Sequence, residues 1–265
     1  LTIVTDSIGK SSLFGGVATA IIMGAIIARD DRRSLRIITR TERADPRAVS
    51  MILKHNGINA NIDVEFLFYP SDRMRPMEVS KNEIFITTSW WTTQCVINSV
   101  SPDRIIYLLQ EDERGFYPLG DDYIRAEAVM ARRDLRFVIN TPLLKRHLIQ
   151  TGLANLNDAS CAFEPAFDST SFYREPKEQK RLRLGFYARP NNPRNLFYLG
   201  LEILDEVTKS GIINGETWEI VLFGKDVPPI TFEGNCEVVI ADSLPWNEYA
   251  ALIRSIDVGL SLMAT

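Results

Sequence analysis

Apolar residues follow two alternating patterns along this chain. Short continuous apolar runs are typical of strands that are buried on both faces of a parallel sheet. Between these runs the apolar residues repeat at helical spacing, as Val17, Ile21, Gly24 and Ala28 do. The strands predicted in the first part of the chain are Leu1–Thr5, Leu35–Thr39, Ile62–Tyr69, Glu83–Thr87, Arg104–Gln110 and Arg136–Ile139. Further helices are predicted at residues 45–57, 121–132 and 142–150. Strands that alternate with helices indicate a parallel sheet with helices on both faces.

The alternation weakens between residues 153 and 180 and then starts again. Residues 175–183 (EPKEQKRLR) are charged and include a proline, which is typical of a linker. The strands predicted beyond it are Leu184–Tyr187, Trp218–Phe223, Glu237–Ile240 and Val258–Leu262, with helices over 193–210 and 245–255. The pattern therefore predicts two α/β domains, residues 1–175 and 176–265. In such sheets ligands bind beyond the carboxyl ends of the strands.

Composition narrows the classes of protein. The chain has 265 residues, 45% of them hydrophobic, and a net charge of −4, as expected for a globular protein. An acidic balance argues against nucleic-acid binding and against strong electrostatic docking to membranes. One local basic patch, formed by Arg29, Arg32, Arg33 and Arg36, still allows peripheral membrane association.

Cysteine and histidine usage argues against structural metal and disulfide sites. Cys95, Cys161 and Cys236 are far apart, so they form neither a disulfide framework nor a zinc motif, and they suit a reducing cytoplasm. His55 and His147 fall on predicted helices without partners of a catalytic type, so surface or capping roles are expected.

The longest apolar run, residues 17–28, is too short to cross a bilayer. The chain does not begin with methionine, opens inside an apolar run and stops just after another. We therefore expect it to be a piece of a longer protein.

The loop after the first predicted strand contains glycines that suggest anion binding. Gly9–Ser11 resembles part of a P-loop, but that motif needs a glycine where Val4 stands, and the dinucleotide pattern G-x-G-x-x-G is missing as well. These absences disfavour a nucleotide-binding regulator. Gly15 and Gly16 remain, at a helix start where free backbone N–H groups favour an anion. The alternative is a tight turn that lets the helix pack on the sheet.

Two further segments follow predicted strands. Residues 87–93 (TTSWWTT) offer hydroxyl groups and the indoles of Trp90 and Trp91, which can hydrogen-bond to and stack on a sugar; the alternative is a helix N-cap with buried tryptophans. The acidic run Glu111–Glu113 is followed by a Phe-Tyr-Pro turn that contains Tyr117. Its carboxylates could hold a metal, act as acid or base, bind sugar hydroxyls, or form a solvated surface.

The most informative segment is residues 189–195 (RPNNPRN). It follows a predicted strand and opens a helix predicted to begin at Pro193. Arg189 and Arg194 stand five residues apart, and guanidinium groups match phosphate oxygens bidentately. Lys225 ends a later strand, where it could point to the same crevice or be an ordinary surface lysine.

Several of these segments together resemble bacterial rhamnosyltransferases of polysaccharide (rhamnan) synthesis, which have the GT-B glycosyltransferase fold. The matching segments are FGGVATA (14–20), TTSWWTT (87–93), YLLQEDERGFYP (107–118), FEPAFD (163–168), GFYARPNNPRNLFYLGLE (185–202) and SLPWNEYAALIRSIDVGLSLMAT (243–265). They cover nearly the whole chain in the expected order.

The resemblance implies an α/β protein of GT-B type, with two Rossmann-like domains whose parallel sheets face a cleft. The N-terminal domain is expected to bind the acceptor glycan and the C-terminal domain, incomplete in this chain, the nucleotide-sugar donor. Related retaining enzymes clamp the donor diphosphate with an Arg and a basic residue five apart, which Arg189 and Arg194 match. Such enzymes generally need no metal and no other cofactor. The family continues beyond a segment like SLMAT into a donor-binding helix, so this chain alone is expected to be a poor catalyst.

The expected activity is transfer of L-rhamnose from dTDP-L-rhamnose to a growing surface polysaccharide or lipid-linked glycan, in the cytoplasm or at the inner face of the membrane. The expected catalytic residues are Glu111, Asp112 and Glu113. The expected donor-diphosphate residues are Gly15, Gly16, Arg189, Arg194 and Lys225. The expected acceptor residues are Trp90, Trp91 and Tyr117. The alternatives are a GT-B transferase with a UDP- or GDP-hexose donor and a non-catalytic glycan-binding or assembly module.

Overall fold

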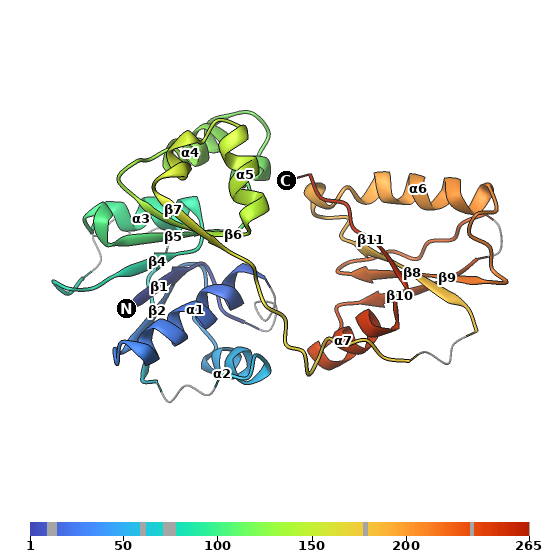
Figure 1. The fold of residues 1–265 in the computed structure, drawn as a ribbon, viewed down its shortest axis with the longest axis horizontal. Helices are drawn as coiled ribbons and strands as arrows, with labels where there is room; N and C mark the ends of the chain where they lie inside the picture. The colour runs from blue at the N-terminus through green and yellow to red at the C-terminus, as the bar shows by residue number, and fades with distance from the viewer. Residues whose placement is uncertain (10–14, 59–61, 71–77, 177–179, 234–235, 265) are drawn as a thin grey trace. The chain divides into compact units, whose positions relative to one another are not determined.

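The computed structural model describes residues 1–9, 15–58, 62–70, 78–176, 180–233 and 236–264. The chain divides into two compact units, which we call unit 1 (Leu1–Phe167) and unit 2 (Asp168–Thr265) (Figure 1). The sequence predicts a boundary after residue 175, whereas the observed boundary follows Phe167, so residues 168–175 belong to unit 2. Lys10 and Ser11 of the P-loop-like segment, Phe14, and residues 177–179 of the linker lie outside the described residues.

Unit 1 is built on a seven-stranded sheet in which every pair of neighbours is parallel. Its strands are β1 (Thr2–Thr5), β2 (Leu35–Thr39), β3 (Val64–Phe68), β4 (Phe85–Thr87), β5 (Ile105–Leu109), β6 (Arg136–Asn140) and β7 (Ser160–Phe163), in the order β3-β2-β1-β4-β5-β6-β7. Strand β7 is absent from the sequence prediction because the apolar run of this short edge strand, Cys161–Phe163, is only three residues long.

Helices cover both faces of this sheet, as the pattern predicts. They are α1 (Gly16–Asp30), α2 (Pro46–His55), α3 (Trp90–Ile97), α4 (Asp121–Met130) and α5 (Pro142–Gln150), with short 3-10 turns at Pro102–Arg104, Glu113–Phe116 and Ala154–Asn157. Helices α1 and α2 lie on one face of the sheet, and α3, α4 and α5 on the other (Figure 1). Neighbouring strand residues point to opposite faces: Ile3 packs into the core under α1 and α2, and Val4 into the core under α3, α4 and α5.

Unit 2 has a four-stranded parallel sheet with the order β10-β9-β8-β11. Its strands are β8 (Leu182–Ala188), β9 (Trp218–Gly224), β10 (Glu237–Asp242) and β11 (Val258–Leu260). Helix α6 (Phe197–Lys209) lies on one face and α7 (Trp246–Ser255) on the other (Figure 1). Phe197 and Leu204 of α6 join Phe186 in the core, and the ring of Tyr249 on α7 lies 6.0 Å from that of Phe223.

The helix start predicted at Pro193 is wrong. Residues Pro193–Asn195 form a separate 3-10 turn, and Leu196 has a left-handed backbone (φ 47°), which ends the turn before α6 begins at Phe197. The side chain of Asn192 accepts a hydrogen bond from the Arg194 N–H (3.3 Å) and caps that turn instead of the helix. Arg194 therefore lies in a loop ahead of α6.

Both sheets contain a point at which the strand order reverses. It lies between β1 and β4 in unit 1 and between β8 and β11 in unit 2. Crevices form outside the carboxyl ends of strands at such points, and these edges are where ligands bind in open α/β sheets.

Candidate functional site

Loops after β1, β4 and β5 bring two carboxylates and two indoles together at the carboxyl edge of unit 1. The indole Nε1 of Trp91 donates to Oδ2 of Asp6 (2.7 Å). The backbone N–H of Trp90 donates to Oε2 of Glu113 (2.7 Å). Asp6 follows β1 and the tryptophans follow β4, so the Asp6–Trp91 hydrogen bond spans the reversal point of the sheet.

The start of α3 explains why the Trp90 N–H is available to donate a hydrogen bond to Glu113. Ser89 and Thr92 form a reciprocal capping box, which satisfies part of the first helical turn. The N–H of Trp90, at the first helical position, needs another partner, and Glu113 supplies it. The N-cap expected as the alternative is thus present, and of the two tryptophans only Trp90 is buried.

The two indoles have different surroundings. Trp90 is buried in the core of unit 1; its ring packs edge-on against Tyr117, and its Nε1 donates to the Tyr117 hydroxyl (3.2 Å). Trp91 is half-buried and packs edge-on against Trp90. Of these three expected acceptor residues, Trp90 has its ring enclosed, whereas Trp91 and Tyr117 reach the surface.

Burial dominates the electrostatics of this cluster. Burial raises the pKa of Glu113 to about 7, and the nearby negative charges of Asp6 and Asp112 also raise it. The hydrogen bond from the Trp90 N–H favours the ionised carboxylate and acts in the opposite direction. Burial also raises the pKa of Asp6, while the Trp91 indole and the Arg40 guanidinium act in the opposite direction. Glu113 can therefore exchange a proton near neutral pH.

Asp112 has a different environment from Glu113. Its two oxygens accept from Nε and Nη2 of Arg114 at 2.8 and 2.7 Å, and Nη2 of Arg114 also donates to Oγ1 of Thr151 (2.8 Å). Nε2 of His147 lies 3.7 Å from Asp112. The third expected acid, Glu111, is half-buried in the same loop. Asp112 thus forms a buried ion pair that holds its loop in place.

The glycines at the start of α1 allow a close approach to the loop after β5. The side chain of Gln110 donates to the carbonyl of Gly16 (3.0 Å), and a Cβ at Gly16 would lie 2.7 Å from Nε2 of Gln110. Gly15 has a left-handed φ of 76°, which favours glycine. This is the close packing that the tight-turn alternative describes.

Unit 2 places cations at the carboxyl edge of its own sheet. Arg189 directly follows β8, and Lys225 directly follows β9, whose last residue, Gly224, pairs in register with Ala188. A Cβ at Gly224 would lie 2.0 Å from the carbonyl oxygen of Ala188, so glycine is required for the two loops to approach. Lys225 is exposed and Arg189 half-buried.

Arg194 is held at the same edge by the segment that follows β11. The Ala264 N–H donates to the Arg194 carbonyl (2.9 Å), and the Asn195 amide donates to Sδ of Met263 (3.2 Å). Burial lowers the pKa of Arg194, although a guanidinium stays charged at neutral pH. Because β11 and β8 flank the reversal point, the Arg194 loop borders the crevice expected there.

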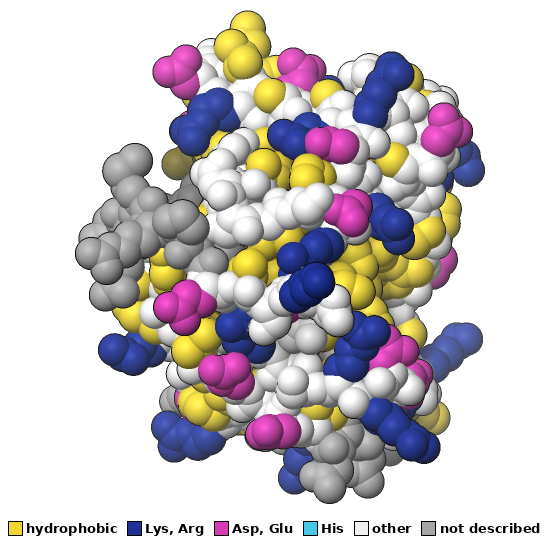
Figure 2. Space-filling model, turned by 90° about the vertical axis from the view of Figure 1, so that its left-hand side faces the viewer, with side chains coloured by type: hydrophobic (Ala, Val, Ile, Leu, Met, Phe, Trp, Pro, Cys, Tyr) yellow, Lys and Arg dark blue, Asp and Glu magenta, His cyan; other side chains and the backbone are white. Residues whose placement is uncertain are grey.

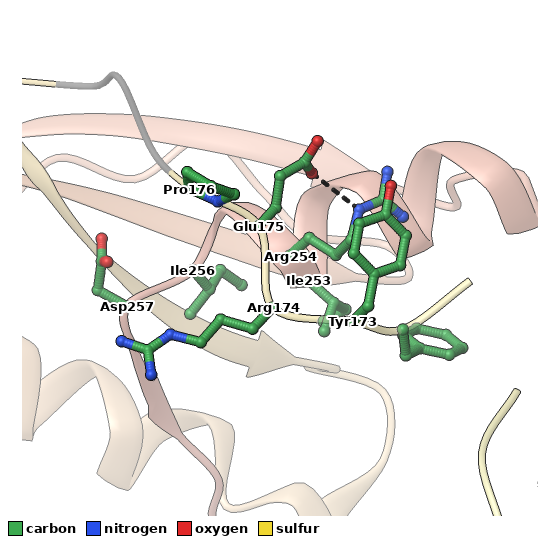
Figure 3. Close-up of a pocket in the computed structure, with 9 residues that line it drawn as sticks. Tyr173, Arg174, Glu175, Pro176, Ile253, Arg254, Ile256 and Asp257 are labelled. Carbon is green, nitrogen blue, oxygen red and sulfur yellow. Dashed lines mark hydrogen bonds and ion pairs between the residues drawn. The ribbon is translucent and has the colours of Figure 1, made fainter. Parts of the chain in front are cut away.

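A pocket of about 870 Å³ lies at the opposite edge of the same sheet (Figure 3). Its walls include Ile256 and Asp257 ahead of β11, and Asp257 accepts from the Arg183 N–H near the start of β8 (2.8 Å). Arg254 fastens the segment that lines it, with Nε 3.1 Å from Glu175 and its guanidinium over the Tyr173 ring. Its described lining includes none of the predicted site residues.

The local basic patch is largely neutralised. Arg29 pairs with Asp30 (2.8 Å), Arg33 with Asp31 (3.4 Å), and Arg36 with Glu83. On the face of the molecule shown in Figure 2, basic and acidic side chains are likewise interspersed.

Within the described ranges, no three His, Cys, Asp or Glu residues gather as metal ligands, and no helix is both long and apolar enough to cross a bilayer. Sequence reasoning missed two residues of the unit 1 edge, Asp6 and Arg40. Each is a charged residue directly after a predicted apolar strand, and that position was the available signal.

The fold is that of GT-B glycosyltransferases. The structure of Anabaena HepE in complex with UDP and glucose aligns with a TM-score of 0.57 and 11% identity, over 100% of this chain and 74% of HepE. A glycosyltransferase from Rickettsia africae aligns with a TM-score of 0.53 and 13% identity, over 98% of this chain and 72% of that protein.

The chain belongs to the WsaF family. Residues 1–141 match the family described as WsaF, N-terminal domain, and residues 182–265 match WsaF, C-terminal domain. The chain is also 32% identical over 186 residues to the O-antigen biosynthesis protein RfbC of Myxococcus xanthus. That match covers 69% of this chain and 14% of the length of RfbC.

Proposed function

We propose that the protein is a glycosyltransferase that transfers L-rhamnose from dTDP-L-rhamnose to a growing surface polysaccharide or its lipid-linked precursor. Membership of the WsaF family and similarity to a protein named for O-antigen biosynthesis support this proposal. The observation that carries it is the pair Arg189 and Arg194 in the loop after β8, where a diphosphate can bind at the reversal point of the unit 2 sheet.

In this proposal the two units divide the substrates. Unit 2 binds the donor diphosphate through Arg189 and Arg194, with Lys225 as an outer cation. Unit 1 binds the acceptor, with Trp91 and Tyr117 at its surface. If the configuration inverts, Glu113 receives the proton.

The reaction is displacement at the anomeric carbon. The bond from this carbon to the diphosphate oxygen breaks, and a bond to the acceptor oxygen forms. We propose retention, in which the acceptor proton leaves on the released nucleoside diphosphate. The arginines stabilise the negative charge that develops there, so no metal is needed, each contributing about 3 kcal/mol. The reaction takes place in the cytoplasm or at the inner face of the membrane.

A thermal-shift panel tests the proposal with dTDP-rhamnose, UDP-glucose, GDP-mannose and ATP. A ligand at about 100 times its Kd stabilises a protein by about 2.7 kcal/mol, so a bound donor raises the melting temperature measurably. We expect a shift with dTDP-rhamnose and its loss in Arg189→Ala and Arg194→Ala, with affinity reduced about 10–100-fold, as for a lost charged hydrogen bond. The matched control is Arg174→Ala, an exposed arginine at the pocket of the opposite edge.

A melting-temperature shift with UDP-glucose or GDP-mannose alone would mean that the donor carries a hexose and not rhamnose. The structure of HepE, which holds UDP and glucose, is the reason to include this alternative. A cooperative melt without a shift for any sugar nucleotide would instead favour a non-catalytic glycan-binding module.

A further inference from the structure

Asp6 is a charged group at the unit 1 edge that the proposed function leaves without a role. Its backbone carbonyl accepts from the N–H groups of Arg40 (2.9 Å) and Thr41 (2.8 Å), which ties the loop after β1 to the loop after β2. Its Oδ2 accepts from the Trp91 indole (2.7 Å). Within the described residues Oδ1 has no donor, and the side chain is half-buried. One carboxylate oxygen is thus fixed and the other can accept a hydrogen bond.

The Arg40 side chain lies close enough to this carboxylate for its charge to act on it. It is only 8% exposed, and its Nε has no hydrogen-bond partner in the described part of the chain. Burial raises the pKa of Asp6 and of the Cys95 thiol of α3, and the charge of Arg40 acts against this rise in both groups. A buried cation is tolerated where a carboxylate offsets its charge, and it favours the ionised form of that carboxylate.

Glu113 provides the contrast within the same cluster. It is 3% exposed, accepts from the Trp90 backbone N–H, and lies close enough to Asp6 for the charge of Asp6 to raise its pKa. Asp6 has a cation and an indole donor, whereas Glu113 is enclosed. When two interacting carboxylates differ in this way, the proton stays on the enclosed group and the other remains an anion.

We propose that Asp6 is a residue that binds the acceptor sugar, with Oδ1 accepting a hydrogen bond from one of its hydroxyls, and that Trp91, which donates to Oδ2, and the buried Arg40 are the positioning residues for this carboxylate. The inference rests on the proposed function. The ligand class is a neutral polyhydroxyl sugar because the half-buried Asp6 offers a carboxylate, while the Arg40 guanidinium is buried.

The test separates acceptor binding from donor binding. In Asp6→Asn the kcat/KM for the acceptor falls about 10–100-fold, as expected for a lost hydrogen bond to a charged group. The Kd for the nucleotide sugar and the slow hydrolysis of the donor by water stay unchanged. The matched control is Asp63→Asn, an exposed aspartate in unit 1. Normal transfer by Asp6→Asn would overturn the assignment, whereas a wild-type protein that binds no nucleotide sugar would overturn the proposed function instead.

Arg40 is tested through the pH profile. In Arg40→Gln the acid limb of the acceptor kcat/KM moves to higher pH, by about one unit for the loss of a neighbouring opposite charge, and Arg40→Lys restores it. A purely structural role would lower activity at all pH values without moving the limb, and that result would remove Arg40 from the proposal.

A binding measurement on the wild-type protein covers the case in which a variant does not fold. Addition of an oligosaccharide acceptor shifts the indole ¹⁵N–¹H resonance of Trp91, because the hydrogen bond that this group donates to Asp6 changes. A resonance that stays fixed while the acceptor saturates the protein would overturn the inference.

Discussion

The carboxyl edges of the two sheets share a topology but not a chemistry. Each lies at a reversal of strand order in a parallel sheet. In unit 1 the edge holds two interacting carboxylates, Asp6 and Glu113, with indole and backbone donors. In unit 2 it holds Arg189, Arg194 and Lys225. The fold supplies two similar sheet edges, and a few loop residues give one edge carboxylates and the other cations.

The largest expected effect concerns stability and is confined to unit 1. Asp112→Asn leaves the buried Arg114 with only its longer ion pair to Glu127 (3.5 Å), which costs about 3 kcal/mol. The matched control is Asp122→Asn, because Asp122 pairs with Arg125 at the exposed surface (3.3 Å) and such pairs contribute about 0.5 kcal/mol. Hydrogen exchange read by mass spectrometry follows each unit separately.

We expect Asp112→Asn to lose amide protection throughout unit 1 while unit 2 keeps its own. Full protection together with lost transfer activity would contradict this and return Asp112 to the catalytic role expected from the sequence.

The next effect is a pH dependence of stability that comes from Glu113 at the unit 1 edge. The pKa of Glu113 is about 7 in the folded protein, against 4.5 for an ordinary glutamate. The folded state therefore binds more protons than the unfolded state between pH 4.5 and 7, and its free energy of unfolding falls as pH rises through that window, by about 3 kcal/mol from this group. Glu113→Gln removes this component because an amide does not titrate.

The measurement is urea unfolding of both proteins across that pH range. The difference in unfolding free energy between wild type and Glu113→Gln should change steadily from pH 4.5 to 7 and level off above it. The control, Glu65→Gln, replaces an exposed glutamate on β3 and should run parallel to wild type. A constant difference for Glu113→Gln would mean that this carboxyl titrates as an exposed one does.

The two edges also differ in how far the sequence predicts them. Arg189 and Arg194 belong to one short segment after an apolar strand, so periodicity and spacing find them together. The unit 1 edge is assembled from loops after β1, β2, β4 and β5, and only the folded sheet brings Asp6 and Arg40 next to Trp91. Sequence reasoning identified Glu113 only as one of three acids, because burial, which separates it from Asp112, is a property of the tertiary structure.

Local backbone geometry limited the prediction in the same way. The alternation of strands and helices is strong enough to predict both sheets. The break at Leu196, by contrast, depends on a left-handed residue that is neither glycine nor asparagine, so the sequence signals for helix starts favour Pro193.

The smallest expected effect tests whether Lys225 contacts the nucleotide sugar directly or acts on it only as a nearby charge. Lys225 is exposed, whereas Arg194 is half-buried and tied through its carbonyl to Ala264. Lys225→Ala should weaken nucleotide-sugar binding only about two- to three-fold, as expected for an exposed charge pair, and added salt should remove the difference. Titration calorimetry at low and high salt measures the affinity and its salt dependence. The matched control is Lys180→Ala, which replaces an exposed lysine ahead of β8.

A loss of affinity as large as that of Arg194→Ala that persists in high salt would place Lys225 in direct contact with the diphosphate. The anion site would then extend from β8 across to β9, and the difference between the two edges would lie in the number of strands that contribute to each site as well as in their chemistry.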